Sequence, residues 1–414
     1  MTVPHTARVP RLINTSQKLQ RWLPALAADC GPVAADTERA CGFRYFQRAY
    51  LIQLKTASTG VCLIDPVSLS DEVLSELAAA LVGKEWIIHS VHNDLPCLRE
   101  LGLVPSRLFD TEVAARMLSR ERVGLGPLLE DVLGIHLAKE HSNSDWSQRP
   151  LPPAWLSYAA DDVEFLIELA TALRQELTQA DKLGWAEQEF AYLLARPDPE
   201  PKPDPWRSTT NIHLVRTRRG LAIIERVWTL REQIARDLDL SPHLIVTDRT
   251  IAAMAAHATH DDVSESLAAL SVGEWTRKVA PEHLAVFRDA VIAAGRLGED
   301  DLPPYKVRRG LPATGRWARS KPEAAKRWEL VRPAVNDLAE QHQLPPEHLI
   351  APKALRALLW EPTGLTAAAI DRQLADEEVR DWQRALLVPL LADLLGALAE
   401  GSQHPRHDLV GGEA

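Results

Sequence analysis

Two acidic side chains follow an apolar segment in the stretch PVAADTERA, residues 32–40. Asp36 and Glu38 are separated only by Thr37, and residues two apart in an extended chain point to the same face. Two like charges on one face repel, and burying bare carboxylates costs free energy. A divalent cation would remove that cost, because Mg²⁺ and Mn²⁺ prefer hard oxygen ligands. The pair therefore predicts a metal site at a strand end, completed by acidic residues from elsewhere in the chain.

Suitable residues occur in two later segments. Asp94 follows the short apolar stretch EWIIHS and opens a predicted helix, where its carboxylate could equally be a simple helix cap. Tyr158 and Asp162 are four residues apart, which places both on one face of a helix. Taken singly, Tyr158 could be a core aromatic and Asp162 a solvated charge. Asp161 points about 100° away from Asp162 and is interpreted as a bystander.

The order of these segments is more specific than any one of them. DTE at 36–38, NDLPCL at 93–98 and YAADD at 158–162 resemble the three exonuclease motifs of the DEDD superfamily, in its tyrosine-bearing branch. The flanking stretches RAYLIQL, FDT and SDWSQRPL extend the resemblance to the ribonuclease D family. One departure is the acid at position 161, where a small residue is common in that family.

The resemblance implies a set of roles for these residues. The metal-binding acids would be Asp36, Glu38, Asp94 and Asp162, holding two divalent cations, Mg²⁺ or Mn²⁺, and Tyr158 would orient the attacking water. Two cations can stabilise both ends of an in-line displacement at phosphorus. The implied catalytic residues are these four acids together with Tyr158, and the implied reaction is release of 5′-mononucleotides from RNA 3′ ends.

Several functions remain open at this point. We expect a metal-dependent 3′→5′ exoribonuclease acting on tRNA precursors or other structured RNA. A 3′→5′ DNA exonuclease is an alternative, because the acids do not recognise the sugar and RNA preference needs contacts to the 2′-hydroxyl. A nucleic-acid-binding protein with an inert nuclease fold, or a scaffold for protein interaction, are further alternatives.

The elements that must position these residues alternate between strands and helices. The stretches at 31–38, 49–56 and 59–66 are short and rich in β-branched and apolar residues, which predicts a meander of three strands. Helical spacing follows at 69–83, 93–102 and 126–134, a strand-to-helix change at about Thr111, and one long amphipathic helix at 154–179. The predicted fold class is an α/β domain, with an RNase H-like mixed sheet flanked by helices, followed by all-α modules.

The helical half begins after a stretch with a proline at every second position, 197 to 205, which predicts a stiff extended linker. A faint repeat follows, since segments starting at Arg226 and Lys326 each contain an early Trp and Arg, a proline turn and the sequence HLI. These segments resemble the helicase-and-RNase-D C-terminal (HRDC) modules. The predicted domains are an exonuclease domain at 1–196, a proline-rich linker at 197–213, an HRDC-like domain at 214–300, and a second HRDC-like domain with a basic connector at 301–414.

Charge and composition constrain the partners. The net charge of −10 argues against a general polyanion binder. Basic residues nevertheless gather in one larger and one smaller group, for each of which a solvated linker and phosphate contact are alternatives. The larger group is Lys306, Arg308, Arg309, Arg316, Arg319, Lys321, Lys326 and Arg327, and the smaller is Arg207, Arg216, Arg218 and Arg219. We expect the helical modules to grip the body of the RNA while the first domain takes its 3′ end.

The remaining features indicate a cytoplasmic protein. The four cysteines show no paired CxxC spacing, which is typical of reduced thiols. No uninterrupted apolar run reaches the roughly 18 residues that a bilayer requires, so we expect no membrane span. We also expect a monomer.

Overall fold

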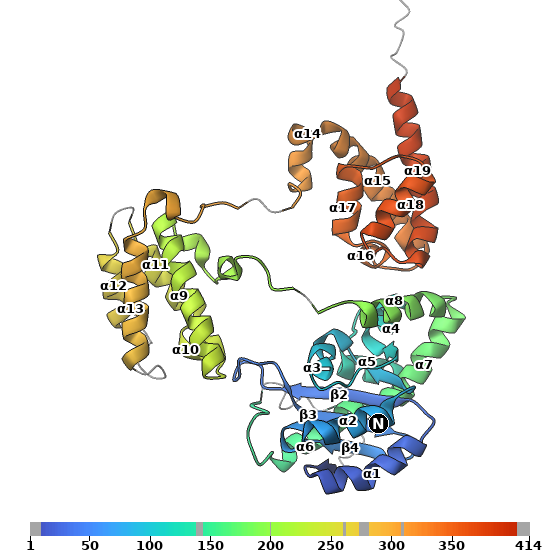
Figure 1. The fold of residues 1–414 in the computed structure, drawn as a ribbon. Coiled ribbons are helices and arrows are strands. Elements are labelled where there is room, and N and C mark those ends of the chain that lie inside the picture. The colour runs from blue at the N-terminus through green and yellow to red at the C-terminus, as the bar shows by residue number, and fades with distance from the viewer. Residues whose placement is uncertain are drawn as a thin grey trace, which may run out of the picture.

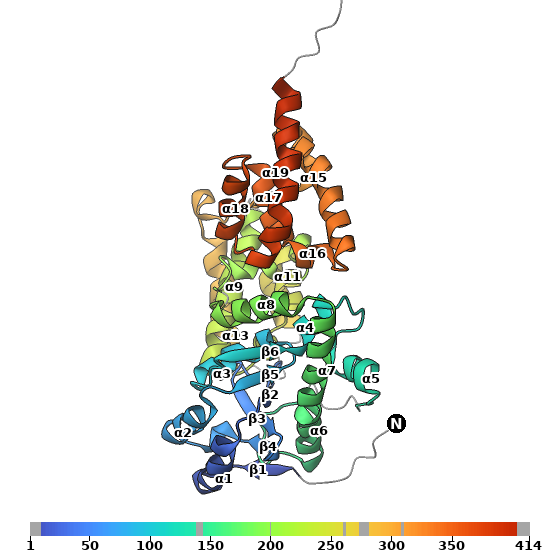
Figure 2. The ribbon, with the colours of Figure 1, turned by 90° about the vertical axis from the view of Figure 1, so that its right-hand side faces the viewer.

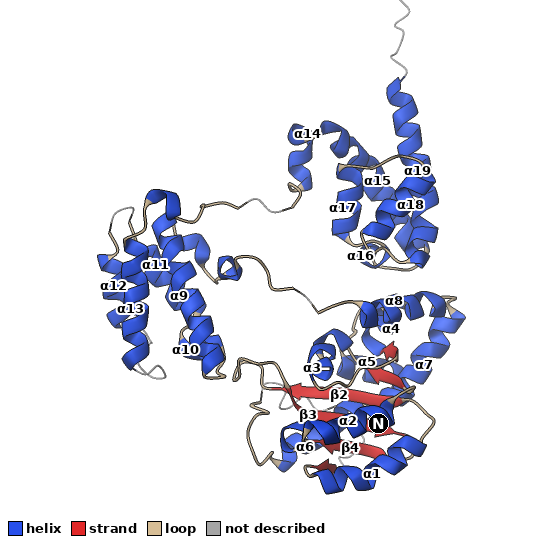
Figure 3. Cartoon of the chain, viewed as in Figure 1, coloured by secondary structure: helices blue, strands red, loops and turns tan. Residues whose placement is uncertain are grey.

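The chain folds into one α/β body and two helical bodies (Figure 1). The structure is a computed structural model, and it describes residues 10–137, 144–198, 200–259, 262–272, 281–307 and 310–403. Figure 3 shows that the strands are confined to the α/β body, and no strand follows Asp110 among the described residues. The predicted fold class, a mixed sheet flanked by helices and then helical modules, is confirmed.

The α/β body is built on one sheet of six strands within the described residues, in the order β1-β4-β3-β2-β5-β6. The strands β2, β3 and β4 are joined as antiparallel neighbours, whereas the pairs β1–β4, β2–β5 and β5–β6 are parallel. This arrangement confirms the predicted three-strand meander. The strands are β1 (Arg11–Ile13), β2 (Val33–Arg39), β3 (Ala49–Thr56), β4 (Gly60–Ile64), β5 (Glu85–Ile88) and β6 (Arg107–Asp110).

Helices cover both faces of this sheet. Figure 2 shows α1, α2 and α3 on one side of the strands and α6 and α7 on the other. The helices of this body are α1 (Ser16–Ala28), α2 (Asp71–Leu81), α3 (Leu95–Glu100), α4 (Thr111–Met117), α5 (Leu125–Leu133), α6 (Pro153–Glu164), α7 (Leu166–Gln179) and α8 (Leu183–Ala195). Two of these boundaries match sequence signals closely, because α4 begins at Thr111 and α5 ends before Gly134, which adopts a positive φ of 68°.

The single long helix predicted at 154–179 is wrong, because the chain breaks at Phe165. That residue has φ −115° and ψ 8°, and it ends α6 and begins α7. The break lets α6 lie across β2, β3 and β4, while α7 packs against α4 and β5. Hydrophobic periodicity continues through the break and therefore could not reveal it.

The two helical modules repeat one local pattern. A 20-residue helix, a one-turn helix that starts at a proline and a nine-residue helix follow one another in α9, α10 and α11, and again in α15, α16 and α17. Asp239 and Gln343 both adopt positive φ, 47° and 49°, at the matching turns. The arginine of each module lies over its tryptophan, Arg231 at 5.8 Å from Trp228 and Arg332 at 5.9 Å from Trp328.

Both modules consist of helices and connecting segments within the described residues. The first module holds α9 (Arg218–Asp237), α10 (Pro242–Ile245), α11 (Asp248–Ala256), α12 (Ser264–Val272) and α13 (Pro281–Gly295). The second holds α14 (Trp317–Ser320), α15 (Pro322–Gln341), α16 (Pro346–Leu349), α17 (Pro352–Trp360), α18 (Ala367–Asp376) and α19 (Asp381–Gln403).

The predicted proline linker is not extended along its whole length. Residues Pro205–Ser208 form one turn of 3₁₀ helix, and Trp206 is buried in the core of the first module. A buried indole at this point attaches the end of the linker to that module, since burying a large aromatic side chain is strongly favourable.

The helix α19 departs from the expectation that no segment could span a membrane. By length and composition alone, residues Asp381–Glu400 are long and apolar enough to cross a membrane, and 28% of this apolar stretch is buried. Core helices of soluble proteins pass the same test, and here Leu387, Leu391 and Leu395 are buried within the hydrophobic core. One such helix is weak evidence for a membrane span.

Candidate active site

The strand β2 presents Asp36 and Glu38 on the face of the sheet that α6 covers. Asp36 lies opposite Gln53 on β3, and Glu38 lies opposite Leu51. A bulge between Glu38 and Arg39 ends the regular pairing directly after the second acid. The alternation expected from the sequence therefore holds, and both carboxylates lie at the carboxyl end of one strand.

The helix α6 brings a third carboxylate to this pair. One oxygen from each of Asp36, Glu38 and Asp162 lies within 4.8 Å of the other two. Tyr158, one helical turn before Asp162, is hydrogen-bonded to that carboxylate. Burial is the main cause that raises the pKa of the Tyr158 phenol, so the hydroxyl is protonated at neutral pH and donates.

Asp94 approaches from the opposite face of β2. It occupies the cap position of α3 but makes no side-chain cap hydrogen bond within the described part of the chain. Its carboxylate accepts a hydrogen bond of 2.6 Å from the Thr37 hydroxyl instead. The simple helix-cap alternative therefore does not describe this residue.

The turn before Asp94 is held by Asp110, at the end of β6. Its carboxylate accepts hydrogen bonds from the backbone N–H groups of Ser90, at 3.2 Å, and Val91, at 2.8 Å. Ser90 has a positive φ of 67°, an unusual conformation for a serine that these bonds stabilise. Asp110 thus fixes the segment that leads into Asp94, a role that the FDT stretch did not suggest by itself.

Burial and mutual repulsion govern the charges of the four acids. Burial first, and then the charges of Asp94, Asp162 and Glu38, hold the pKa of Asp36 well above its usual range. Burial, followed by the charges of Asp162 and Asp94, raises the pKa of Glu38 to about 9. Burial also raises the pKa of Asp94 to about 6 and that of Asp162 to about 7. The cluster therefore holds protons strongly when nothing else neutralises it.

This donor set fits a divalent cation. Carboxylate oxygens are the ligands that such ions prefer, and an added positive charge relieves the repulsion that raises these pKa values. Gln53, opposite Asp36, is fully buried, and neither its amide nitrogen nor its oxygen has a hydrogen-bond partner among the described residues. A buried amide without a partner is costly unless water or a bound group completes it.

The structure also places Asp161, Arg149 and His89. Among the described residues, Asp161 is not one of the three clustered acids, but its charge is the second cause, after burial, of the raised pKa of Asp162. Arg149 pairs with the buried carboxylate of Asp65 through two contacts of 2.8 Å, which indicates a structural ion pair. His89 contacts the Thr111 hydroxyl at 2.9 Å, and burial lowers its pKa to about 4.

The SDWSQRPL stretch supports the tyrosine. Trp146 is fully buried and lies 6.4 Å, ring centre to ring centre, from Tyr158 and 5.3 Å from Trp155. This packing orients the face of α6 that carries the tyrosine.

Sequence reasoning missed Thr37, Asp110 and Gln53. Thr37 stands between two acids in the sequence, and alternation along β2 places it on the opposite face, from which Asp94 approaches. No signal in the sequence links Gln53 to Asp36, because their proximity depends on the register between β2 and β3.

Models of known protein families match three parts of the chain. A family model described as a 3′-5′ exonuclease matches residues 10–178. Models described as an HRDC domain and as a 3′ to 5′ exonuclease C-terminal domain match residues 220–278 and 310–395.

Similar whole proteins are also known. A ribonuclease D of Granulibacter bethesdensis is 29% identical over 85% of this chain and 86% of its own length. A crystal structure of a protein from Bifidobacterium adolescentis is 33% identical, with a TM-score of 0.83 over 94% of this chain and 97% of the other. RNase D of Escherichia coli, an exoribonuclease involved in structured RNA processing, has a TM-score of 0.65 at 24% identity, over 94% of this chain and 99% of the other.

Proposed function

The chain belongs to the ribonuclease D family of 3′→5′ exoribonucleases, and from this premise we propose which of its residues cleave RNA. The protein is a phosphodiester hydrolase whose substrate is RNA, and its fold implies the use of divalent metal. The identities of the ions, the ligands and the natural RNA are proposals that follow from the site.

We propose that Asp36, Glu38, Asp94 and Asp162 hold two divalent cations, Mg²⁺ or Mn²⁺. When bound, such cations stabilise the charge that develops on the attacking and leaving oxygens of an in-line displacement. Thr37 keeps the carboxylate of Asp94 oriented through their 2.6 Å hydrogen bond.

The proposed role of Tyr158 is to position the attacking water. Its hydroxyl is protonated and is anchored to Asp162, so its oxygen can accept a hydrogen bond from water beside the acids. Such a contact holds the nucleophile at the phosphorus and contributes through orientation rather than through proton transfer.

One observation carries this proposal above the others. Carboxylates from two separate segments of the chain, β2 and α6, lie within 4.8 Å of one another, at a strand end that Asp94 approaches from the other side. The complete set of acids argues against an inert nuclease fold, since a protein that only binds nucleic acid gains nothing from keeping them.

The substrate that we propose is the 3′ end of tRNA precursors or of other structured RNA. The two helical modules would hold the body of such an RNA. A DNA exonuclease remains the second candidate, because cations held by the four acids would act on the phosphate, and neither they nor the acids recognise the sugar.

A direct experiment compares wild type and Asp36→Asn on matched RNA and DNA oligomers with Mg²⁺ or Mn²⁺. The proposal expects wild type to release 5′-mononucleotides from RNA much faster than from DNA. It expects the variant to lose at least about a hundredfold in rate while keeping its melting temperature. Full activity of a pure Asp36→Asn preparation would show that the assignment is wrong.

The predicted domain division is also a proposal, with one adjustment. A separate hydrophobic core unites residues of 206–302, which supports an independent first module. Because Trp206 belongs to that core, we propose that the module begins at Pro205 rather than at residue 214. A monomeric state and a cytoplasmic location are proposed as well, the latter supported by four cysteines without a disulfide among the described residues.

A further inference from the structure

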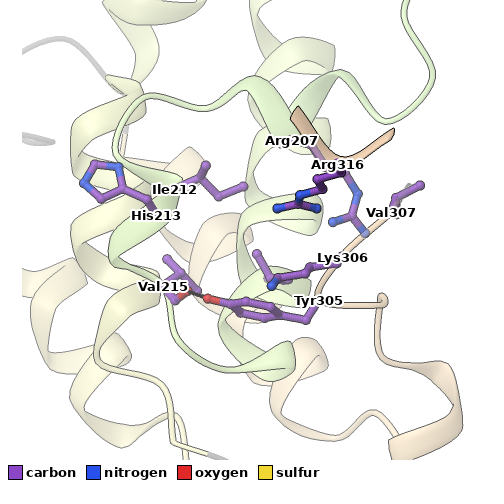
Figure 4. Close-up of a pocket in the computed structure, with 9 residues that line it drawn as sticks. Arg207, Ile212, His213, Val215, Tyr305, Lys306, Val307 and Arg316 are labelled. Carbon is purple, nitrogen blue, oxygen red and sulfur yellow. Dashed lines mark hydrogen bonds between the residues drawn. The ribbon is translucent and has the colours of Figure 1, made fainter. Parts of the chain in front are cut away.

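A pocket with basic and aromatic side chains lies outside the α/β body. It forms where the end of the proline-rich segment meets the connector between the two modules. A pocket of about 700 Å³ is lined there by residues from 207–221 and from 305–316. Figure 4 shows the side chains of Arg207, Lys306 and Arg316 gathered around this pocket, with Tyr305 along one side. Such a volume is in the range of pockets that hold small organic ligands.

The pocket carries positive charge that the protein itself does not neutralise. Lys306 and Arg316 have no acidic partner among the described residues, and both are exposed. Arg207 is held in place and partly neutralised, because its guanidinium donates to the Pro304 carbonyl at 2.9 Å, lies 4.2 Å from the ring of Trp206 and pairs with Asp204 at 3.5 Å. The positive charge of Lys306 and Arg316, beside the fixed guanidinium of Arg207, therefore makes the pocket suitable for an anion.

Arg218 and Arg219 in the same region are directed at backbone carbonyls of the protein itself, whereas Arg216 is exposed. Arg219 is buried and donates to the carbonyls of Ala294 and Gly295. Arg218 donates to the carbonyl of Leu302. Arg218 and Arg219 thus stabilise the backbone of their own module, whereas Arg308 and Arg309 lie outside the described residues.

Apart from His213, the remaining lining is largely apolar. Tyr305 is 41% exposed, and its hydroxyl donates to the Val215 carbonyl at 3.0 Å, which fixes the ring at the side of the pocket. Ile212, Val215 and Val307 contribute aliphatic surface. A fixed aromatic ring beside free cations is the combination with which proteins bind single-stranded nucleic acid, the bases stacking and the phosphates pairing with charge.

We propose that this pocket binds one nucleotide unit of a single-stranded segment of the RNA substrate, away from the site of cleavage. The base stacks on Tyr305, and the flanking phosphates contact Lys306 and Arg316. The proposal rests on the proposed function in that RNA is the substrate. In this proposal the connector between the modules binds RNA and is not only a solvated linker.

The test measures RNA binding in full-length protein that carries Asp36→Asn, so that the probe is not cut. The probe is a fluorescent oligouridylate of about 16 nucleotides, the upper end of common site sizes. We expect Lys306→Gln with Arg316→Gln to weaken binding about tenfold near physiological salt. We also expect it to lower the slope of log affinity against log salt by about two, one for each phosphate contact.

A matched control removes the same number of charges from the same basic segment but outside the pocket. Arg319→Gln with Lys326→Gln is expected to leave the affinity within about twofold of the parent, because single exposed charges contribute little. Equal weakening of RNA binding by both double variants would overturn the proposal, because it would indicate a general attraction between the basic segment and RNA. No weakening by the pocket pair, or no binding by the parent, would also overturn it.

A second pair of variants tests the aromatic contact. Tyr305→Leu removes the stacking surface and is expected to weaken binding about tenfold, whereas Tyr305→Phe keeps the ring and the affinity. Equal affinities for both variants would show that the base does not stack here. None of these outcomes depends on cleavage, whereas the proposed function is tested separately by the release of mononucleotides from RNA.

Discussion

At the scale of single residues, the protein concentrates negative charge that only a cation can stabilise well. Asp36, Glu38 and Asp162 have oxygens within 4.8 Å of one another, and burial raises the pKa of each. Tyr158 and Thr37 each donate a hydrogen bond to one acid of the set. These two hydroxyl groups make separable contributions, which two conservative substitutions can measure.

Replacing Tyr158 with phenylalanine removes the hydroxyl and leaves the ring packed near Trp146. We expect kcat on a short RNA oligomer to fall about a hundredfold, because positioning of the nucleophile is lost. Metal binding, measured by calorimetric titration, should persist, since the four carboxylates remain. Disappearance of the metal-binding heat in Tyr158→Phe would contradict the role given to this residue.

Replacing Thr37 with valine keeps the shape of the side chain and removes the hydrogen bond to Asp94. We expect the affinity for Mn²⁺ to fall about tenfold or more, because partners that orient metal ligands typically contribute that much. Thr37→Ser is the control, since it keeps the hydroxyl and should keep the affinity. Identical titrations for the valine and serine variants would show that the contact at 2.6 Å is not functional.

The residues of the site differ in how well the sequence alone could predict them. The four acids and Tyr158 could be predicted because they stand in short motifs whose order resembles one family. Gln53 could not, because a glutamine in an apolar strand carries no sign of its partner across the sheet. Asp110 was visible within FDT, yet its bonds to the turn before Asp94 join segments about 20 residues apart.

At the scale of elements, the position of the site depends on how helices meet strands. The break at Phe165 separates the helix that carries Tyr158 and Asp162 from the helix that packs on β5. The strands β2, β3 and β4 were predicted well, because short stretches rich in β-branched and apolar residues favour buried strands. The strand β1 and the helix α1 were not predicted, and the docking between helices of different bodies left no pattern at all in the sequence.

The clearest docking contact joins α8 of the α/β body to α19 of the second module. The rings of Trp185 and Trp382 are stacked with centres 4.9 Å apart and planes 15° from parallel. The Trp382 indole N–H also donates to Glu189 at 2.8 Å, and Arg380 pairs with the same carboxylate. This contact places both bodies in one hydrophobic core.

Replacing Trp382 with alanine should therefore loosen the second module. We expect a loss of about 3 kcal/mol in unfolding free energy, typical of a buried tryptophan, and a larger radius of gyration by small-angle scattering. Trp360→Ala is a suitable control, because Trp360 packs on Trp317 inside the module. It should destabilise the module without changing the radius of gyration. An unchanged radius for Trp382→Ala would contradict this docking.

At the scale of the whole molecule, both modules contact the α/β body, and one contact adjoins the active-site strand. The segment after β2 meets the first module, where Phe43 accepts a hydrogen bond of 3.0 Å from Ser241 and Phe46 donates one of 3.2 Å to Asp239. Figure 1 shows the first module on the left, the second above, and the α/β body below. The sequence predicted the existence of two modules from their repeat, but their placement depends on contacts such as these, which join distant residues.

The acid cluster also sets how the stability of the whole protein depends on pH when metal is removed. In the folded state the pKa of Glu38 is raised to about 9 and that of Asp162 to about 7, from ordinary pKa values of 4.5 and 3.8. Because the folded state binds these protons more tightly than the unfolded state, this stabilisation is full below pH ~4 and is lost as pH rises towards ~9.

In chelator, the unfolding free energy of wild type should therefore fall more steeply between about pH 5 and pH 8 than that of Asp162→Asn. Urea titrations of both proteins at several pH values measure this difference, and addition of Mn²⁺ at the higher pH should restore the stability of wild type. Parallel pH profiles of the two proteins would show that the cluster does not carry these protons.

The most direct measurement of the central claim is anomalous diffraction from crystals soaked with Mn²⁺ and a 5′-mononucleotide. The account predicts two manganese peaks among the carboxylates of Asp36, Glu38, Asp94 and Asp162, with the nucleotide phosphate beside them and the Tyr158 hydroxyl facing it. Manganese bound elsewhere, or no peak between these carboxylates in crystals that retain activity, would contradict it.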